Sequence, residues 1–473
     1  MGSSIKRAAF TLLFTSIGTH AATPADIEER LDQLAKQNES LKERVAQLEE
    51  AGPSPADKKP AKSEQGIVHT NHSYSYDILD PTTNITRRQE LILSQKKESG
   101  IGSNALYLSG AVTPIADYQK SNTESKFGYL MRHPTENNQR TKTVSEAVIH
   151  SAQIALTATV GDWVTTYVEI LYDPQQSFGS GTLTDLNRNQ VQVRRGYVLL
   201  GDLEATPVYA SLGKMDVPFG LMDTVNPFTA STVWHAFGGL AYGLNTGIKT
   251  DSFSLRLMGI QGGAQFRAAN VPVDNSNVPS KLNNYAADIS YTFPLGESSH
   301  WLIGSSYIKG SPYCQGFPVV HFEACEEENG AYDIYTQLHI GNWEVQGEYA
   351  KTQDEWPGTF NPTIPEFDAS KVTSWDLGTR YTTALGGKKS QFSLEFSRFV
   401  AGPDGAEWEK QDQWVLGFAS FVTPSAKLFV EAIRTEGYAP LNFISGGNLG
   451  PGATHSVADA HSNILMIGAN VAY

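Results

Sequence analysis

The stretch NWEVQGEYA (residues 342–350) decides the fold class, because its polar and apolar residues alternate one by one. In an extended strand, successive side chains point to opposite faces of the sheet. One face of this strand would carry Trp343, Val345, Gly347 and Tyr349. The other face would carry Asn342, Glu344, Gln346 and Glu348. Such a strand can place one face against lipid and the other in water, as the strands of a transmembrane β-barrel do.

The same alternation repeats outward from this strand, from about Ala105 to the C-terminal Tyr473. We find roughly sixteen segments of about ten residues, the strand length and even strand number of bacterial outer-membrane barrels. Short connections alternate with long ones. The short ones are predicted at 161–162, 201–206, 250–251, 294–300, 341–342, 383–390 and 422–425. The long ones are predicted at 116–143, 173–187, 214–240, 261–282, 309–330, 352–371, 400–411 and 437–462. The sequence therefore predicts an all-β fold, a transmembrane antiparallel barrel of about 16 strands over residues 105–473.

Tryptophan positions distinguish this barrel from a soluble all-β protein, whose strands would also alternate. Trp163, Trp301 and Trp343 each open a predicted strand just after a short connection. An aromatic girdle at the membrane–water interface lies at this depth. The chain also has no run of about 18 or more apolar residues, so its sequence predicts no membrane-spanning helix.

The N-terminus predicts export from the cytoplasm. Two basic residues precede an apolar stretch at 8–18, and THA (19–21) resembles a small-x-small cleavage site, so we interpret residues 1–21 as a signal peptide. No cysteine follows this site, which argues against a lipoprotein. The formal net charge of −14 argues against nucleic acid as a partner. We expect a protein of the bacterial cell outer membrane whose N-terminal segment lies in the periplasm.

A heptad pattern follows over residues 22–50. Its apolar seam repeats alternately four and three residues apart, which is typical of a short coiled coil. The seam consists of Ile27, Leu31, Leu34, Asn38, Leu41, Val45 and Leu48. By side-chain rules this seam favours a parallel dimer, whereas porin-like barrels more often form trimers. The alternative is an amphipathic helix that packs on another surface. We expect a homo-oligomer, with a homotrimer ahead of a dimer.

Residues 51–104 connect the predicted coiled coil to the barrel. The first part, 51–66, is rich in Pro, Ala, Lys and Ser, which is typical of a flexible spacer. Residues 86–97 could form a short helix, and residues 72–79 are aromatic and polar. The sequence leaves open whether residues 67–104 plug the lumen or lie beneath it.

Six blocks of sequence carry a resemblance to a known family. They are SYDILDPTTNITRRQ (75–89), GKMDVPFGLMDTVNPFT (213–229), VWHAFGGLAYG (233–243), YCQGFPVVHFEAC (313–325), SRFVAGP (397–403) and GYAPLNFISGGN (437–448). Through them the chain resembles the LbtU-type siderophore porins, themselves distantly similar to the phosphate-selective O/P-type porins. The resemblance implies a periplasmic coiled coil before a sixteen-stranded barrel. It also implies uptake of a ferric siderophore through the lumen, without the TonB-linked plug of larger receptors.

Charged residues of both signs are phased toward the lumen. About sixteen strands enclose a water-filled interior, so these residues could orient a charged solute. Each of them could instead be solvated by lumen water or paired across strands. The lumen-lining candidates are Arg194, Arg256, Asp288, Asp333, His339, Glu344, Glu348, Asp376, Arg380 and Glu395. A one-residue register slip would reverse the faces.

The connection 214–240 is the predicted constriction of the pore. It is rich in apolar and aromatic residues, which favour folding inward over exposure to water. The residues that would line the narrow zone are Lys214, Asp216, Asp223 and His235. The alternative is a loop that packs across a subunit boundary.

Cys314 and Cys325 are the two cysteines of the chain, and both fall in one long external connection. In an oxidising compartment they are expected to form a disulfide. A metal site with His321 and Glu323 is the alternative, and it is the weaker one. We read the bridge as shaping an external loop.

Catalytic motifs are missing from the sequence. It contains neither a G-x-S-x-G elbow nor an H-E-x-x-H motif. The His-Ser dipeptides at 72–73, 150–151 and 461–462 would point to opposite faces if they lie in strands. We therefore expect no enzyme and no cofactor. The first expectation is a siderophore channel, the second a porin for phosphate or other small solutes, and the third a structural barrel that tethers the envelope.

Overall fold

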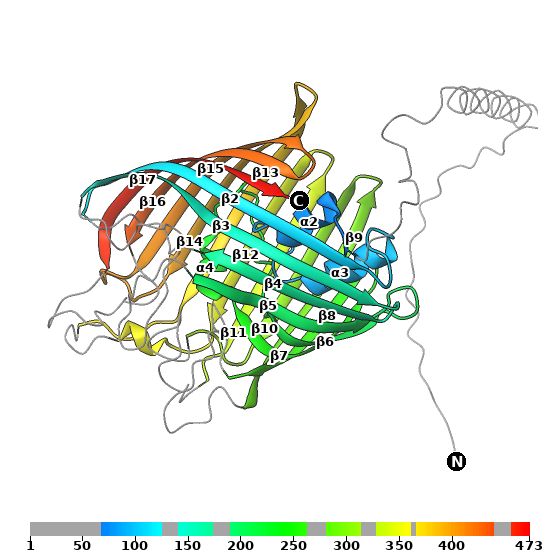
Figure 1. The fold of residues 1–473 in the computed structure, drawn as a ribbon. Coiled ribbons are helices and arrows are strands. Elements are labelled where there is room, and N and C mark those ends of the chain that lie inside the picture. The colour runs from blue at the N-terminus through cyan, green and yellow to red at the C-terminus, as the bar shows by residue number, and fades with distance from the viewer. Residues whose placement is uncertain are drawn as a thin grey trace, which may run out of the picture. The chain divides into compact units, whose positions relative to one another are not determined.

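Sixteen antiparallel strands form a closed ring in the computed structural model of the protein (Figure 1). The structure describes residues 68–124, 141–173, 190–262, 281–313, 328–360, 366–438 and 456–473. Each strand from β2 to β17 pairs with the next, and β17 pairs back with β2 through Val471 and Val112. A closed ring satisfies the backbone without a free edge, as lipid requires. The predicted all-β barrel of sixteen antiparallel strands is confirmed.

The connections follow the predicted alternation of short and long. In the short connection predicted at 294–300, the strands extend further than expected and leave a turn of only Glu297 and Ser298. The strands of the ring are β2 Leu106–Ser121, β3 Thr143–Val160, β4 Val164–Asp173, β5 Gln190–Gly201, β6 Val208–Asp216, β7 Leu240–Lys249, β8 Phe253–Gln261, β9 Leu282–Gly296, β10 Ser299–Ile308, β11 Ala331–Ile340, β12 Trp343–Thr352, β13 Thr373–Leu385, β14 Lys388–Val400, β15 Lys410–Thr423, β16 Ala426–Tyr438 and β17 Val457–Ala472.

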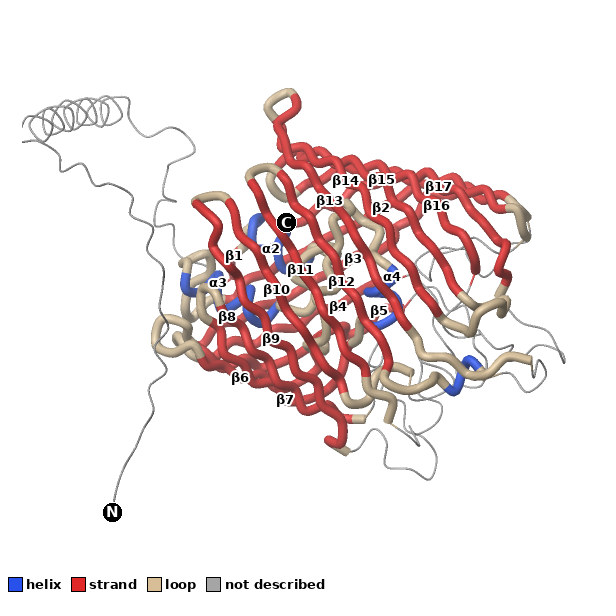
Figure 2. The backbone as a smooth tube through the Cα atoms, turned by 180° about the vertical axis from the view of Figure 1, so that it is seen from behind, coloured by secondary structure: helices blue, strands red, loops and turns tan. Residues whose placement is uncertain are grey.

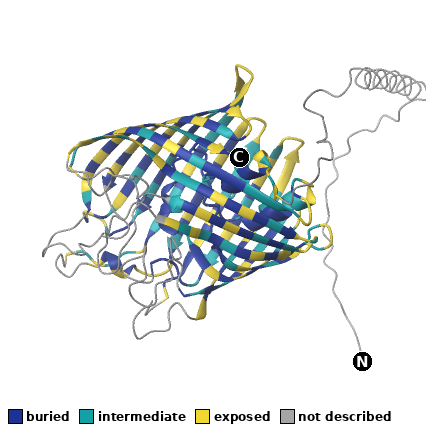
Figure 3. Ribbon diagram, in the orientation of Figure 1, coloured by how far each residue is buried: buried dark blue, intermediate teal, exposed yellow. Residues whose placement is uncertain are grey.

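Exposure alternates residue by residue along the strands, which gives the checkered pattern of Figure 3. In β12, Trp343, Val345 and Tyr349 are exposed on the outer face, whereas Glu344 and Glu348 are buried on the inner face. The outer wall is therefore apolar and the inner wall polar. This arrangement suits a wall that stands in lipid.

The chain enters the barrel through residues 68–104, which we call the N-terminal plug. It contains β1 (Val68–His69), which pairs in parallel with β2, and two helices, α2 (His72–Leu79) and α3 (Arg88–Lys97). Both helices lie inside the ring of strands (Figure 2). The sequence left open whether this segment plugs the lumen or lies beneath it. In the structure it fills part of the lumen.

Helix α2 was not foreseen from the sequence. It begins at Asn71, whose side chain accepts a hydrogen bond from the backbone N–H of Tyr74. Tyr74, Ile78 and Leu79 are buried in the same cluster as Ile92 of α3. The helix is therefore stabilised by packing inside the barrel more than by local sequence.

None of the described helices is long and apolar enough to cross a membrane. The predicted signal peptide, the coiled-coil seam from Ile27 to Leu48, the spacer and the Cys314–Cys325 bridge all lie outside the described residues. They remain predictions.

Candidate functional site

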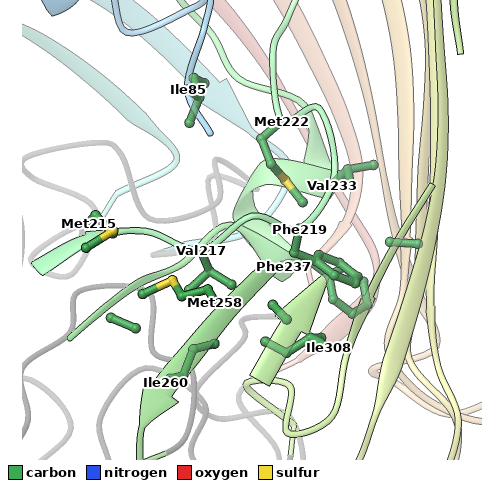
Figure 4. Packing of buried hydrophobic residues seen from close by; sticks show 14 of the residues in the cluster. Ile85, Met215, Val217, Phe219, Met222, Val233, Phe237, Met258, Ile260 and Ile308 are labelled. Atoms are coloured by element: carbon green, nitrogen blue, oxygen red, sulfur yellow. The ribbon is translucent and has the colours of Figure 1, made fainter. Parts of the chain in front are cut away.

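Residues 217–239 fold into the barrel, and we call this segment the inward loop. It follows β6 and ends before β7, and it contains the short helix α4 (Thr232–Phe237). Nearly every residue of it is buried. The Phe219 and Phe237 rings lie against each other, with centroids 5.8 Å apart (Figure 4). Tyr313 extends this contact to Phe237 at 5.2 Å. The apolar side chains of the loop thus form a core inside the lumen.

Three glutamates of the wall hold the backbone and polar side chains of the inward loop. They lie on alternate strands, Glu348 on β12, Glu395 on β14 and Glu431 on β16, and all three are buried. A carboxylate can accept about four hydrogen bonds, and those that involve its charge are the stronger kind. The three side chains therefore act as anchoring points spaced along the loop.

Glu348 anchors the first bend of the loop. Its carboxylate accepts from the backbone N–H of Leu221 at 2.7 Å and of Met222 at 3.0 Å. Met222 has a φ of +60°, an unfavourable conformation for a side chain with a Cβ. Gly220, with φ +71°, has no room for a Cβ, which would lie 2.2 Å from a Glu348 oxygen. The tight bend thus depends on the glycine and on the carboxylate together.

Glu395 and Glu431 hold the rest of the loop. Glu395 accepts from the Thr224 hydroxyl at 2.7 Å and from the Asn226 amide at 2.9 Å. Glu431 accepts from the backbone N–H of Phe228 at 2.7 Å and of Thr229 at 3.0 Å, and from the Thr229 hydroxyl. Backbone groups that would otherwise be buried without a partner are therefore satisfied by the wall.

The N-terminal plug and the inward loop meet inside the lumen. An Arg87 Nη lies 2.6 Å from the Asp223 carboxylate, which also accepts from the backbone N–H of Ile85 at 3.0 Å. The Thr224 N–H donates to the carbonyl of Thr82 at 2.9 Å. We call these contacts the latch. Two segments far apart in sequence are therefore joined across the barrel interior.

Burial raises the pKa of the Asp223 carboxyl above its ordinary value of 3.8, although Arg87 and the Ile85 N–H act in the opposite direction. The folded protein thus binds a proton at Asp223 more tightly than the unfolded chain does. The contribution of this group to stability is largest below pH 3.8 and is lost as the pH rises through the raised pKa.

The variant Asp223→Asn is expected to flatten the fall in unfolding free energy as the pH rises from 3.8 through the raised pKa, because it removes this titration. Urea unfolding of the wild type and the variant in detergent over that range measures the slopes. The matched control is Asp251→Asn, because Asp251 lies in an exposed turn and its pKa is lowered by the hydrogen bond from Lys97. Equal slopes for the wild type and Asp223→Asn would contradict the assignment.

Helix α3 of the plug is bound to strands β6 and β8 of the wall. Glu90 accepts from the Tyr209 hydroxyl at 3.1 Å and from the Ser254 hydroxyl at 2.5 Å. Arg256 of β8 pairs with Asp288 at 2.7 Å and also donates to the carbonyl of Thr86. The plug is therefore bound to the wall by buried polar contacts as well as by apolar packing.

The predicted lumen-lining residues lie on the inner face, and two oppositely charged pairs of them are in contact. Arg256 pairs with Asp288, and Arg380 pairs with Glu344. Seven of the ten are buried: Arg256, Asp288, Asp333, Glu344, Glu348, Asp376 and Glu395. Arg194, His339 and Arg380 are partly exposed. Glu348 and Glu395 do not simply line the lumen, because their carboxylates accept hydrogen bonds from the inward loop.

Arg195 is an inward-facing charged residue that the alternation missed. A β-bulge interrupts the pairing of β4 and β5 between Glu169 and Ile170, and Arg194 is the extra residue. Arg195 is fully buried and binds Glu169 at 2.9 Å and Asp216 at 2.6 Å. Arg194 also reaches Glu169, at 3.7 Å. Strict alternation allows only one of two neighbouring arginines to face inward, so no sequence signal marked the pair.

The four predicted constriction residues lie in different places. Asp223 is in the middle of the inward loop, and His235 is buried on α4. Asp216 and Lys214 belong to β6 and not to the loop. Lys214 donates to the carbonyl of Val193 and lies 5.9 Å from the exposed Tyr242 ring, so its side chain is directed away from the inward loop.

A polar cavity of about 140 Å³ lies between α3 and the strands β7 to β11. Arg87 and Lys249 contribute positive charge to it, and Glu90 contributes negative charge. The rest of the lining is mostly hydroxyl, amide and imidazole groups: Ser252, Ser254, Ser290, Thr292, His300, Leu302 and Gln337. Such a set can bind a small oxygen-rich solute by hydrogen bonds. Within the described ranges, no group of three or more His, Cys, Asp or Glu side chains is placed to hold a metal ion.

The chain is similar to several solved structures. Solved structures that it resembles are an anion-selective porin of Comamonas acidovorans (12% identity, 78% of this chain and 99% of that chain, TM-score 0.47), the outer membrane channel DcaP of Acinetobacter baumannii (12%, 78% and 97%, 0.48) and OprB of Pseudomonas putida (9%, 77% and 94%, 0.49). At these identities the likeness concerns the fold alone.

Sequence comparison adds one curated relative. A protein of Coxiella burnetii described as a UPF0422 protein is 24% identical over 241 residues, which are 50% of this chain and 47% of that protein. The chain thus matches about half the length of this relative. No protein-family model matches the sequence.

Proposed function

We propose that the protein is a gated outer-membrane channel, whose closed state is held by the N-terminal plug and the inward loop. The observation that carries this proposal is the latch, in which Arg87 of the plug pairs with Asp223 of the loop at 2.6 Å inside the lumen. A constitutively open porin would need no such contact between two inward segments. Solute passage then requires that one or both segments move.

A ferric siderophore is the cargo that the family resemblance implies, and we propose it first. Uptake of a large and scarce solute is compatible with a lumen that is closed at rest. The second candidate cargo is a small oxyanion such as phosphate. The cavity beside Arg87 and Lys249 favours it, because its lining sets two cations and several hydroxyl donors against one carboxylate, Glu90, around a volume of about 140 Å³. A structural barrel that only tethers the envelope is the remaining alternative.

Planar-bilayer recording of the purified full chain tests the proposal. The wild type is expected to be closed for most of the time and to respond to its cargo with a change in current. Ferric siderophores and inorganic phosphate are added in turn, with the iron-free siderophores as controls. A response to ferric siderophore alone supports the first cargo, and a response to phosphate alone supports the second. Large steady currents without any addition would contradict the closed state, and silence under every condition would favour the structural barrel.

A further inference from the structure

The latch and the polar cavity share one side chain, the guanidinium of Arg87. This residue stands at the N-terminal end of α3 and pairs with Asp223 of the inward loop at 2.6 Å. The same residue lines the cavity of about 140 Å³ between α3 and strands β7 to β11. An anion in the cavity and the carboxylate of the loop would therefore compete for one cation.

Arg87 can be reached by a ligand more easily than its partner can. The Arg87 side chain is 18% exposed, whereas the Asp223 side chain is only 3% exposed and does not line the cavity. The Nε–H of Arg87 is buried, and within the part of the chain that the structure describes it has no hydrogen-bond acceptor. A buried donor without an acceptor is costly, so an acceptor supplied by a ligand would stabilise the guanidinium.

The other charged groups of the cavity suit an anion. Lys249 supplies a second cation, and its Nζ lies 3.8 Å from the Glu90 carboxylate, which is longer than a hydrogen bond. Glu90 already accepts from the hydroxyls of Tyr209 and Ser254. Two cations against one carboxylate leave the lining with a net positive charge.

The size of the cavity selects a small ligand. Pockets that take drug-sized molecules measure roughly 300–1,000 Å³, and one water molecule occupies about 30 Å³ of the liquid. The cavity of about 140 Å³ therefore has room for one small oxyanion and little more. A ferric siderophore does not fit in it.

We propose that the cavity is a regulatory site, in which a small oxyanion such as phosphate draws Arg87 away from Asp223 and thereby opens the latch. The inference rests on the closed state proposed above, and it holds whichever solute then passes through the lumen. Arginine binds phosphate through parallel charge-assisted hydrogen bonds, so the oxyanion can replace the carboxylate as its partner. After the exchange, Asp223 can keep the hydrogen bond from the Ile85 N–H, now 3.0 Å long.

Competition for Arg87 makes the coupling reciprocal. If the oxyanion weakens the pair between Arg87 and Asp223, then loss of that pair strengthens oxyanion binding by the same factor. The variant Asp223→Asn is therefore expected to bind inorganic phosphate roughly fivefold or more tightly than the wild type. A carboxylate that only stabilises the fold would not change the affinity of the cavity in this direction.

Titration calorimetry of the detergent-solubilised full chain with inorganic phosphate measures these affinities. Lys249→Gln is expected to weaken binding about tenfold or more, because a charge-assisted hydrogen bond is lost. Lys97→Gln is the matched control, since it removes the same charge from α3 but pairs with Asp251 in an exposed turn and does not line the cavity. Its affinity should equal that of the wild type. Heat-dependent electrophoretic migration verifies that each variant is folded, and Asp223→Asn keeps the test decisive if Lys249→Gln is not.

Bilayer recording with phosphate in a large excess of potassium chloride tests the opening, because a rise in current then reports open channels and not phosphate flow. Phosphate is expected to raise the open probability of the wild type, and Lys249→Gln should need about tenfold more of it. Absence of phosphate binding, or equal binding by the wild type and Lys249→Gln, would overturn the site. A wild type that binds phosphate but stays closed would overturn the coupling and leave the proposed channel intact, since a siderophore could still open it. Large steady currents without phosphate would contradict the closed state itself, and the inference would fall with it.

Discussion

Deletion of the N-terminal plug, residues 68–104, is expected to convert the channel from a mostly closed state to a continuously conducting one. Sixteen strands enclose a water-filled lumen, so mean conductance is expected to rise on the order of tenfold or more once the plug is gone. The strand ring itself should persist, because each strand of the ring pairs with its neighbours and β17 closes on β2 without the plug. Planar-bilayer recording at fixed voltage measures the change.

Lys97→Ala is the matched control for this deletion. It changes the same segment but breaks only the pair between Lys97 and Asp251, which lies in an exposed turn. Exposed ion pairs contribute little to stability, so the plug should stay in place without this one. The conductance of the variant should therefore equal that of the wild type. If the deletion variant folds, as judged by heat-dependent migration, and yet stays closed, the inward loop alone must seal the lumen and the gating role of the plug is wrong.

Glu431→Ala is expected to lower the free energy of unfolding by roughly 3 kcal/mol, because buried donors lose their acceptor. The backbone N–H groups of Phe228 and Thr229 and the Thr229 hydroxyl all depend on this carboxylate. The truncation also leaves space in a fully buried site. Because the loop is released from β16, the variant should in addition show more frequent channel openings. Urea unfolding in detergent and bilayer recording give the two readouts.

Glu431→Gln separates hydrogen bonding from volume in this test. Its amide oxygen can still accept both backbone N–H groups, and its NH₂ group can donate to the Thr229 hydroxyl. We expect a loss of about 1 kcal/mol or less and channel behaviour close to that of the wild type. If the alanine variant unfolds at the same urea concentration as the wild type, the anchoring role of Glu431 is incorrect. The same comparison can be made at Glu348 and Glu395.

Much of the wall could be predicted from the sequence, because strand alternation is a local property. Trp343 and Glu348 fall on opposite faces because their positions in the strand differ by an odd number and successive side chains alternate between the faces. The short connections carry recognisable turn residues, such as Gly161 and Gly341, both at positive φ. The number of strands follows from these two signals.

The arrangement inside the barrel could not be predicted in the same way. The latch between Arg87 and Asp223 joins residues 136 positions apart, and no periodic pattern relates them. The bulge at Arg194 shifts the face of Arg195 by a single extra residue, which strict alternation cannot represent. Helix α2 depends on packing that exists only once the barrel has formed. Long-range contacts and local irregularities thus account for what the sequence left open.

The order of synthesis gives the anchoring of the inward loop a consequence for assembly. The acceptors for its backbone come later in the chain, and Glu431 follows Phe228 by 203 residues. During export, the loop therefore emerges long before the carboxylates that accept hydrogen bonds from its backbone. A nascent barrel that lacks its last strands has an incomplete interior. Closure of β17 on β2 completes the wall, so interior order and wall completion are expected to occur together, late and cooperatively. A chain truncated before β16 should accordingly be recognised by proteases as incomplete, even though most of its strands are present.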